Sequence, residues 1–83
     1  MVRLPRDLSG AELIKALRAL GYEVTRQSGS HVRLTTLRKG EHHVTVPSHD
    51  PLRVGTLANI LGDVAEHFSW SRAELLDRLF SRR

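Results

Sequence analysis

The sequence predicts an α+β domain in which helices cover one face of a three-stranded antiparallel sheet, with the order α-β-β-β-α and a further C-terminal helix. Three observations lead to this class. Helical periodicity of apolar residues occurs near the N-terminus and again throughout the C-terminal part. Between these parts, three short segments alternate apolar with polar residues, as strands do when one face is buried. The loops between the segments are short, and short connections join antiparallel strands.

The first helix is expected at residues 10–20 and has a complete start signal. Ser9 is placed to cap the helix and Glu12 follows three residues later, which is the spacing of a capping box. Gly21 provides the stop, because glycine readily takes the left-handed conformation that ends many helices. Apolar side chains recur at helical spacing between these signals, at Leu13, Ile14, Leu17 and Leu20.

Three strands are expected next, at residues 22–27, 31–35 and 43–46. In each strand one set of alternate residues is mainly apolar and the other is polar, so each strand has one face of either kind. We expect helices to cover the apolar face of all three strands. The polar face is then left open for a ligand.

The same alternation predicts the strand register. A three-residue loop at 28–30 places Val24 opposite Leu34 and keeps apolar residues together, whereas a two-residue loop places Val24 opposite a polar neighbour. The next loop, at residues 37–41, places Leu34 opposite Val44.

Two helices complete the predicted domain. The first begins between Pro51 and Thr56, and its apolar residues have helical spacing at Leu57, Ile60, Leu61, Val64, Ala65 and Phe68. The second, at residues 72–80, has Ser71 as its cap and Glu74 three residues later, so a second capping box is expected. The role of this last helix is left open between core packing, self-association and contact with a partner.

Length and composition predict one domain, because 83 residues leave no room for a second core. We expect a short leader at residues 1–8 and a single domain at residues 9–83. The absence of cysteine excludes disulfides and thiolate metal sites, and the five histidines lack the spacing of a zinc site, so no metal or other cofactor is expected. No apolar run is long enough to cross a membrane, and we expect a cytoplasmic protein.

The charge balance suggests the kind of partner. Thirteen Lys and Arg residues against nine Asp and Glu residues give a formal net charge of +4. Such a balance favours a polyanion or an acidic protein. The basic residues are spread along the chain, so the charge alone does not define a site.

Residues 26–31, with the sequence RQSGSH, combine a flexible turn, a titratable base and a cation. His31 is expected to begin the second strand, next to Gln27 and near Pro47. Histidine exchanges protons near neutral pH because its unperturbed pKa is about 6.5. A single histidine on a strand is most often a surface or structural residue, so a second argument is needed before it is assigned to catalysis.

Two longer segments supply that argument, GAELIKALRALGYEVTRQSGSHVRL and HHVTVPSHDPLRVGTLANIL. Together they resemble the HicA toxin family of bacterial toxin–antitoxin systems over about residues 9–62. The resemblance implies a double-stranded-RNA-binding-domain-like fold, a metal-independent endoribonuclease (an mRNA interferase) acting on mRNA, and a HicB-type antitoxin as partner. The family's catalytic histidine corresponds to His31, with Gly29 and Ser30 in the supporting turn.

Other residues are candidates for the same site. His49 is expected at the same end of the sheet as His31 and is the candidate second catalytic or phosphate-contacting group. His43 shares the polar face, but four residues of strand separate it from His31 by roughly 13 Å, too far to act on one phosphate. Helix starts bind anions through their unpaired amides. The amides of Gly55 and Thr56 are therefore candidate RNA contacts. The cations Arg26, Arg33 and Lys39 are further candidates because their charge is opposite to that of phosphate.

The sequence leaves two other functions open. One is a catalytically silent RNA-binding module of the same fold. The other is a protein-interaction domain that docks through the polar sheet face or the C-terminal helix, which is compatible with catalysis because an antitoxin must cover His31. The sequence does not predict which RNA sequence or structure is preferred. It also leaves open whether the chain assembles into a homo-oligomer.

Overall fold

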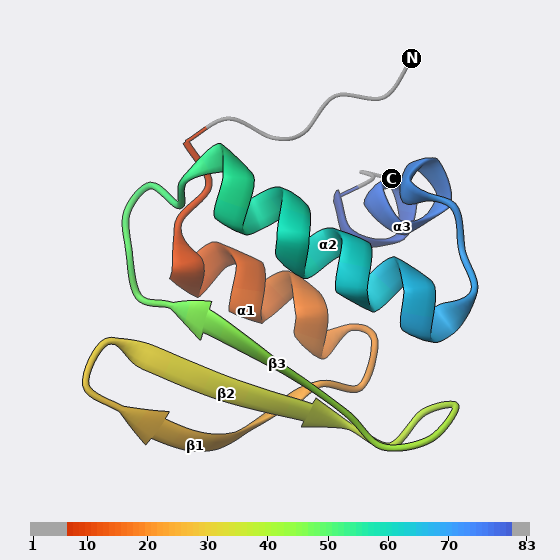
Figure 1. Ribbon diagram of the computed structural model, residues 1–83, viewed down its shortest axis with the longest axis horizontal. Helices are drawn as coiled ribbons and strands as arrows, with labels where there is room; N and C mark the ends of the chain where they lie inside the picture. The colour runs from red at the N-terminus through yellow and green to blue at the C-terminus, as the bar shows by residue number, and fades with distance from the viewer. Residues whose placement is uncertain (1–6, 81–83) are drawn as a thin grey trace.

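The computed structural model describes residues 7–80 and has the predicted element order (Figure 1). The expected leader at residues 1–8 lies outside the described range except for its last two residues. One helix is followed by three strands and two helices, which confirms the α+β class, although α1 ends two residues earlier than predicted. The bounds are α1 Gly10–Arg18, β1 Glu23–Ser28, β2 His31–Thr36, β3 His42–Pro47, α2 Val54–Phe68 and α3 Arg72–Phe80.

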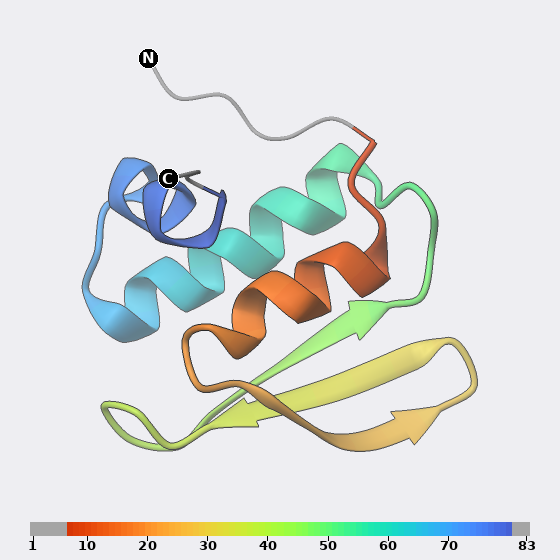
Figure 2. The ribbon, with the colours of Figure 1, turned by 180° about the vertical axis from the view of Figure 1, so that it is seen from behind.

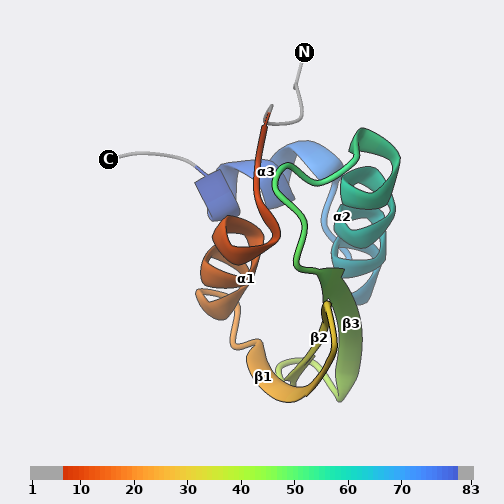
Figure 3. The ribbon, with the colours of Figure 1, turned by 90° about the vertical axis from the view of Figure 1, so that its left-hand side faces the viewer.

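The domain has a sheet and a layer of helices on one of its faces (Figures 1 and 2). The strand order is β1-β2-β3, and both neighbouring pairs are antiparallel. α1 and α2 lie side by side over the sheet and both contact β3, while α3 packs against these two helices on the side away from the sheet (Figure 3). Within residues 7–80, no helix covers the other face of the sheet.

The core lies between the two layers and is built from the residues that the periodicities predict. In β2 and β3 the buried residues alternate with exposed or half-buried ones. The buried apolar set includes Leu13, Leu17, Val32, Leu34, Val44, Val46, Leu57, Leu61, Val64, Phe68, Leu75 and Leu76. One face of β2 and β3 is therefore committed to packing, and the opposite face is available for other roles.

β1 departs from the prediction that helices cover the apolar face of every strand. All six of its residues are exposed, and Val24 is 46% exposed. β1 is an edge strand, and the helices contact the sheet mainly through β3 at the other edge. Tyr22, directly before β1, is fully buried, so the chain leaves the core as the strand begins.

The β1–β2 hairpin has the predicted register at Val24 only, and its loop differs from the predicted one. Val24 pairs with Leu34 as expected, yet Ser28 pairs with His31, so the loop contains two residues instead of three. A β-bulge between Val24 and Arg26 adds one residue to β1 and restores the apolar pairing that a two-residue loop alone would lose. His31 therefore lies beside Ser28, and not beside Gln27 as predicted.

The helix start signals are complete at α1 and half formed at α3. The Ser9 amide donates to Glu12 Oε1 at 2.9 Å, and the Glu12 amide donates to Ser9 Oγ at 3.1 Å, which completes the capping box. At α3 the Glu74 amide donates to Ser71 Oγ at 3.1 Å. The Glu74 carboxylate, however, accepts from the Arg78 guanidinium at 3.0 Å, so the predicted second box lacks its reciprocal bond.

Gly10 is the position at which α1 depends on the absence of a side chain. A Cβ there would collide with the carbonyl oxygen of Pro47, the last residue of β3. We expect Gly10→Ala to lower the free energy of unfolding by about 1–3 kcal/mol, because overpacking forces the helix away from the strand. Urea denaturation measures the change.

Gly62→Ala is the matched control, since a Cβ at that α2 position meets only the Arg72 side chain, at 3.6 Å. Alanine has the higher helix propensity, so this variant should be as stable as the original chain or more stable. Equal losses in the two variants would show that Gly10 is not constrained by β3.

Candidate functional site

The open face of the sheet carries a row of polar side chains along β2. His31, Arg33 and Thr35 alternate with buried residues that face the helices. Directly paired residues on neighbouring strands project to the same face. The row on β2 is therefore extended on β3 by the residues that pair with it. Pro47 pairs with His31, Thr45 with Arg33, and His43 with Thr35.

β1 places a second arginine on this face. Arg26 pairs with Arg33 across the β1–β2 ladder, so both side chains project to the open side. The two-residue turn sets this pairing, and the bulge on the far side of Arg26 keeps Val24 paired with the buried Leu34. Like charges on paired residues repel each other, and a bound anion between them relieves that repulsion.

His31 lies at the end of the sheet where the chain turns from β1 into β2. Gly29, the first of the two turn residues, has a φ of +57°, as a type II′ hairpin turn requires. The Ser30 carbonyl accepts a hydrogen bond from the Ser48 amide at 2.6 Å, which joins this turn to the segment after β3. His31 itself is exposed, so its ring is accessible to a ligand.

His49 lies at the same end of the sheet, as the chain direction predicts. It follows by two residues the Pro47 that pairs with His31. Its carbonyl accepts a hydrogen bond from the Gly10 amide at 2.8 Å, so the start of α1 holds its backbone in place. The residue is exposed. The structure thus brings His31 and His49 to one end of the molecule.

The other predicted RNA contacts are spread more widely. Gly55 and Thr56 lie in the first turn of α2, whose leading amides have no acceptor within the helix. That turn is at the same end as the β1–β2 hairpin but in the helix layer (Figures 1 and 3). Lys39 is in the loop between β2 and β3, at the opposite end of the sheet. The grouping on the open face therefore consists of His31, Arg26 and Arg33.

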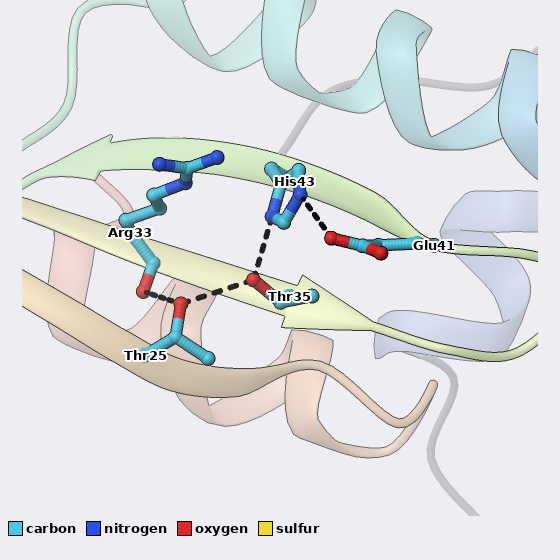
Figure 4. Close-up of polar contacts among 5 residues, drawn as sticks. All are labelled: Thr25, Arg33, Thr35, Glu41 and His43. Atoms are coloured by element: carbon cyan, nitrogen blue, oxygen red, sulfur yellow. Dashed lines mark hydrogen bonds and ion pairs between the residues drawn. The ribbon is translucent and has the colours of Figure 1, made fainter.

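A hydrogen-bonded network occupies the other end of the open face (Figure 4). His43 Nδ1 is 2.7 Å from the Thr35 hydroxyl, and His43 Nε2 is 2.8 Å from the Glu41 carboxylate. The Thr35 hydroxyl is in turn 3.0 Å from that of Thr25. The network fixes the orientation of the His43 ring from both sides.

The two remaining histidines are on the helix side of the sheet. His42 stacks on His67 of α2, with ring centroids 4.4 Å apart and planes inclined by 10°. The Tyr22 hydroxyl lies 2.7 Å from His42 Nδ1, and the Asp63 carboxylate lies 3.7 Å from His42 Nε2. Burial lowers the pKa of His42 and the charge of His67 lowers it further, against the opposing effect of Asp63. Burial, and then Asp63, raises the pKa of Tyr22, which keeps its hydroxyl protonated.

Within residues 7–80, no group of three or more His, Asp or Glu side chains is placed to hold a metal ion. In the same part of the chain, no helix has both the length and the apolar content needed to span a membrane.

The fold and the polar face together define a small α+β domain whose open sheet face carries histidine and arginine side chains. Residues 10–65 match the family described as HicA toxin of bacterial toxin-antitoxin. This match spans more than half of the chain, and the chain belongs to that family, as its motifs predict. It is thus a toxin of a toxin–antitoxin system. Neither the curated proteins nor the solved structures compared with it gave a match.

Sequence reasoning missed two of the contacts just described. The sequence placed His43 on the polar face but did not pair it with Glu41. The signal was available, because residues i and i+2 of an extended chain project to the same face. The sequence had no signal for the stack of His42 on His67, because the two residues belong to elements whose relative placement only the tertiary packing decides.

The lowered pKa of His42 predicts a pH-dependent stability. The unfolded chain takes up the His42 proton at about pH 6.5, whereas the folded chain does so only at lower pH, so protons favour unfolding in that interval. The free energy of unfolding should therefore fall as the pH decreases below about 6.5. Urea denaturation at about pH 7.5, 6.5 and 5.5 measures the trend.

His42→Asn isolates this contribution, because asparagine offers the Tyr22 hydroxyl an acceptor but does not titrate. The variant should lose less stability than the original chain over the same interval. An identical pH dependence in both proteins would show that His42 does not carry the effect.

Proposed function

We propose that this toxin is a metal-independent endoribonuclease, an mRNA interferase, in which His31 is the general base, and that a HicB-type antitoxin neutralises it. The supporting observation is the position of His31, exposed directly after a Gly turn on a sheet face that also carries Arg26 and Arg33. Membership of the toxin family adds to this support.

RNA carries its own nucleophile in the 2′-hydroxyl group, so the protein has to supply only proton transfer and positive charge. A base removes the proton, the 2′-oxygen attacks the adjacent phosphorus, and the bond to the 5′-oxygen of the next nucleotide breaks as an acid protonates that oxygen. The products are a cyclic 2′,3′-phosphate and a 5′-hydroxyl. An exposed histidine suits the base role, because imidazole exchanges protons near neutral pH.

The other candidate residues take supporting roles in this proposal. His49, at the same end of the sheet, is the proposed acid or phosphate contact. Arg26 and Arg33 balance the charge that develops on the phosphorane. RNA that continues around this end of the molecule meets the amides of Gly55 and Thr56. The turn residues Gly29 and Ser30 shape the site, and Lys39 holds RNA backbone at the far end of the sheet.

The proposed antitoxin covers the open sheet face. A surface that is acidic or complementary in shape would meet Arg26 and Arg33 there, and covering the face blocks access to His31. The cytoplasm is the proposed location, since both mRNA and a protein antitoxin are present in it. The C-terminal helix α3 packs on α1 and α2, so its main contribution is to the core.

His31→Ala is the direct test of the catalytic role. In excess EDTA, the original chain should cleave a long mRNA and the variant should be slower by at least about 10²-fold, the usual effect of losing a general base. Gel electrophoresis measures cleavage and circular dichroism checks the fold. The matched control is His67→Asn, which alters a histidine of the helix layer and should leave cleavage unchanged.

The outcomes of this experiment separate the alternatives. Cleavage by the original chain and by His31→Ala alike would transfer the base role to another group, with His49→Ala as the next variant. RNA binding without cleavage by the original chain would support the catalytically silent RNA-binding module.

Arg33→Gln tests the proposed phosphate contact. The logarithm of the RNA affinity should depend less steeply on the logarithm of the salt concentration, by about 0.7 for each single-strand phosphate that the protein no longer neutralises. Fluorescence anisotropy in a His31→Ala background measures binding without cleavage. Lys15→Gln on α1 removes the same charge elsewhere and should keep the original slope; matching slopes in the two variants would argue against the open face as the RNA surface.

The toxin–antitoxin complex should be inactive, because the partner covers His31. Purified complex in EDTA should leave mRNA intact, and Arg33→Glu should weaken the complex by placing a negative charge against an acidic partner surface. Isothermal titration measures that affinity, with Lys15→Glu as the control for the charge change. Robust cleavage by the stoichiometric complex would contradict the proposed mode of neutralisation.

A further inference from the structure

A pocket lies at the end of the open face away from His31, and the proposed catalytic chemistry does not use it. Its volume is about 690 Å³, which is within the usual range for small-ligand sites. It forms where β1 begins and β2 ends. The lining residues are Gly21, Glu23, Thr25, Thr35, Leu37 and Arg38.

The hydrogen-bonded network of Figure 4 ends in this pocket. From Glu41 the chain of contacts runs to His43 at 2.8 Å, to Thr35 at 2.7 Å and to Thr25 at 3.0 Å. The last two residues are also pocket-lining residues. The network therefore controls what these two hydroxyl groups present to a ligand.

The carboxylate sets the direction of the hydrogen bonds. An ionised Glu41 only accepts, so in the neutral ring of His43 Nε2 carries the proton and Nδ1 is left as an acceptor. The Thr35 hydroxyl then donates to His43 Nδ1. The Thr25 hydroxyl donates to Thr35 Oγ1 at 3.0 Å, or to the Arg33 carbonyl at 3.4 Å. In either case both hydroxyl protons are used within the protein, and the two oxygens offer acceptor lone pairs to the pocket.

The rest of the lining agrees with this polarity. Glu23 adds a carboxylate, which accepts hydrogen bonds and repels phosphate, and among the lining residues within 7–80 Arg38 is the one cation. Leu37 is 75% exposed and gives the pocket an apolar surface on which a flat ring can pack. The complementary ligand is planar and has N–H donors on its edge. A nucleobase with an exocyclic amino group has these properties.

We propose that this pocket is a base-recognition subsite, which takes an adenine, cytosine or guanine of the RNA through its exocyclic amino group and disfavours uracil. The inference rests on the proposed ribonuclease function and adds a determinant of where the RNA is cut. Arg26 and Arg33 lie between the pocket and His31, so phosphates pass over the arginines while a base enters the pocket.

The spacing along β2 predicts which nucleotide is recognised. Thr35 follows His31 by four residues, which corresponds to roughly 13 Å of strand. A stacked nucleic-acid strand with the spacing of double-stranded DNA advances by about 3.4 Å per nucleotide. The recognised base therefore lies within about four nucleotides of the bond that is cut.

The experiment removes one amino group at a time from the RNA and one hydroxyl from the protein. In a short RNA with a single cut site, each adenine near the cut is replaced in turn by purine, which lacks only the amino group. Thr25→Val deletes the hydroxyl at nearly constant volume, and Thr25→Ser keeps it. The value of kcat/KM is measured for cleavage, and Kd is measured for the same RNAs in a His31→Ala background.

At one position within about four nucleotides of the cut, purine should lower kcat/KM and weaken binding about fivefold for the original chain, the effect of one hydrogen bond. Thr25→Ser should keep this discrimination and Thr25→Val should lose it. Thr35→Val should lose it too, because it removes a lining hydroxyl and also cuts the network.

The two proposals fail in different ways. Cleavage that requires His31 but accepts purine everywhere, or equal discrimination in Thr25→Val, would overturn the subsite and leave the ribonuclease in place. A third outcome is that no RNA is cleaved but binding still prefers the amino group, and Thr25→Val removes that preference. This outcome would overturn the ribonuclease and keep the subsite. Absence of both activities would overturn both proposals.

Discussion

The burial of one face of β2 and β3 against the helices is the constraint on which the rest of the structure depends. Leu34 and Val44 are buried partners in this interface, and moving either strand by one residue would expose its whole apolar set. This fixed register places every second residue on the open face. The polar row that begins at His31 is therefore a direct consequence of how the core packs.

The bulge in β1 follows from the same constraint. A two-residue turn at Gly29 and Ser30 is tight, and by itself it would shift the pairing of Val24 by one position. The inserted residue corrects that shift, so Val24 pairs with the buried Leu34, while the residues between the bulge and the turn keep the pairing that the turn sets. The turn pairs Arg26 with Arg33 on the open face, where two like charges lie next to each other. The hairpin therefore places positive charge beside His31 through its turn and preserves the apolar pairing of Val24 through its bulge.

The neighbours of each histidine decide what it can do. His31 and His49 are exposed at the hairpin end of the sheet and are available to a substrate. The ring of His43 is held between a carboxylate and a hydroxyl and sets the polarity of the pocket at the other end. His42 and His67 stack against each other on the helix side of the sheet, where burial favours the neutral ring of His42. One residue type therefore serves a proposed catalytic, an orienting and a structural role.

The sequence by itself determined the element order, the complete cap of α1 and the pairing of Val24 with Leu34, because each depends on local signals or on strict alternation. It also determined the family through motifs around His31. Only the tertiary structure decided that β1 stays uncovered, that a two-residue turn pairs Arg26 with Arg33 on the open face, and that Glu41 orients His43. Periodicity describes which side of an element is apolar, but not how far the helices extend over the sheet. Neither does it reveal an inserted residue or which polar side chains meet across neighbouring strands.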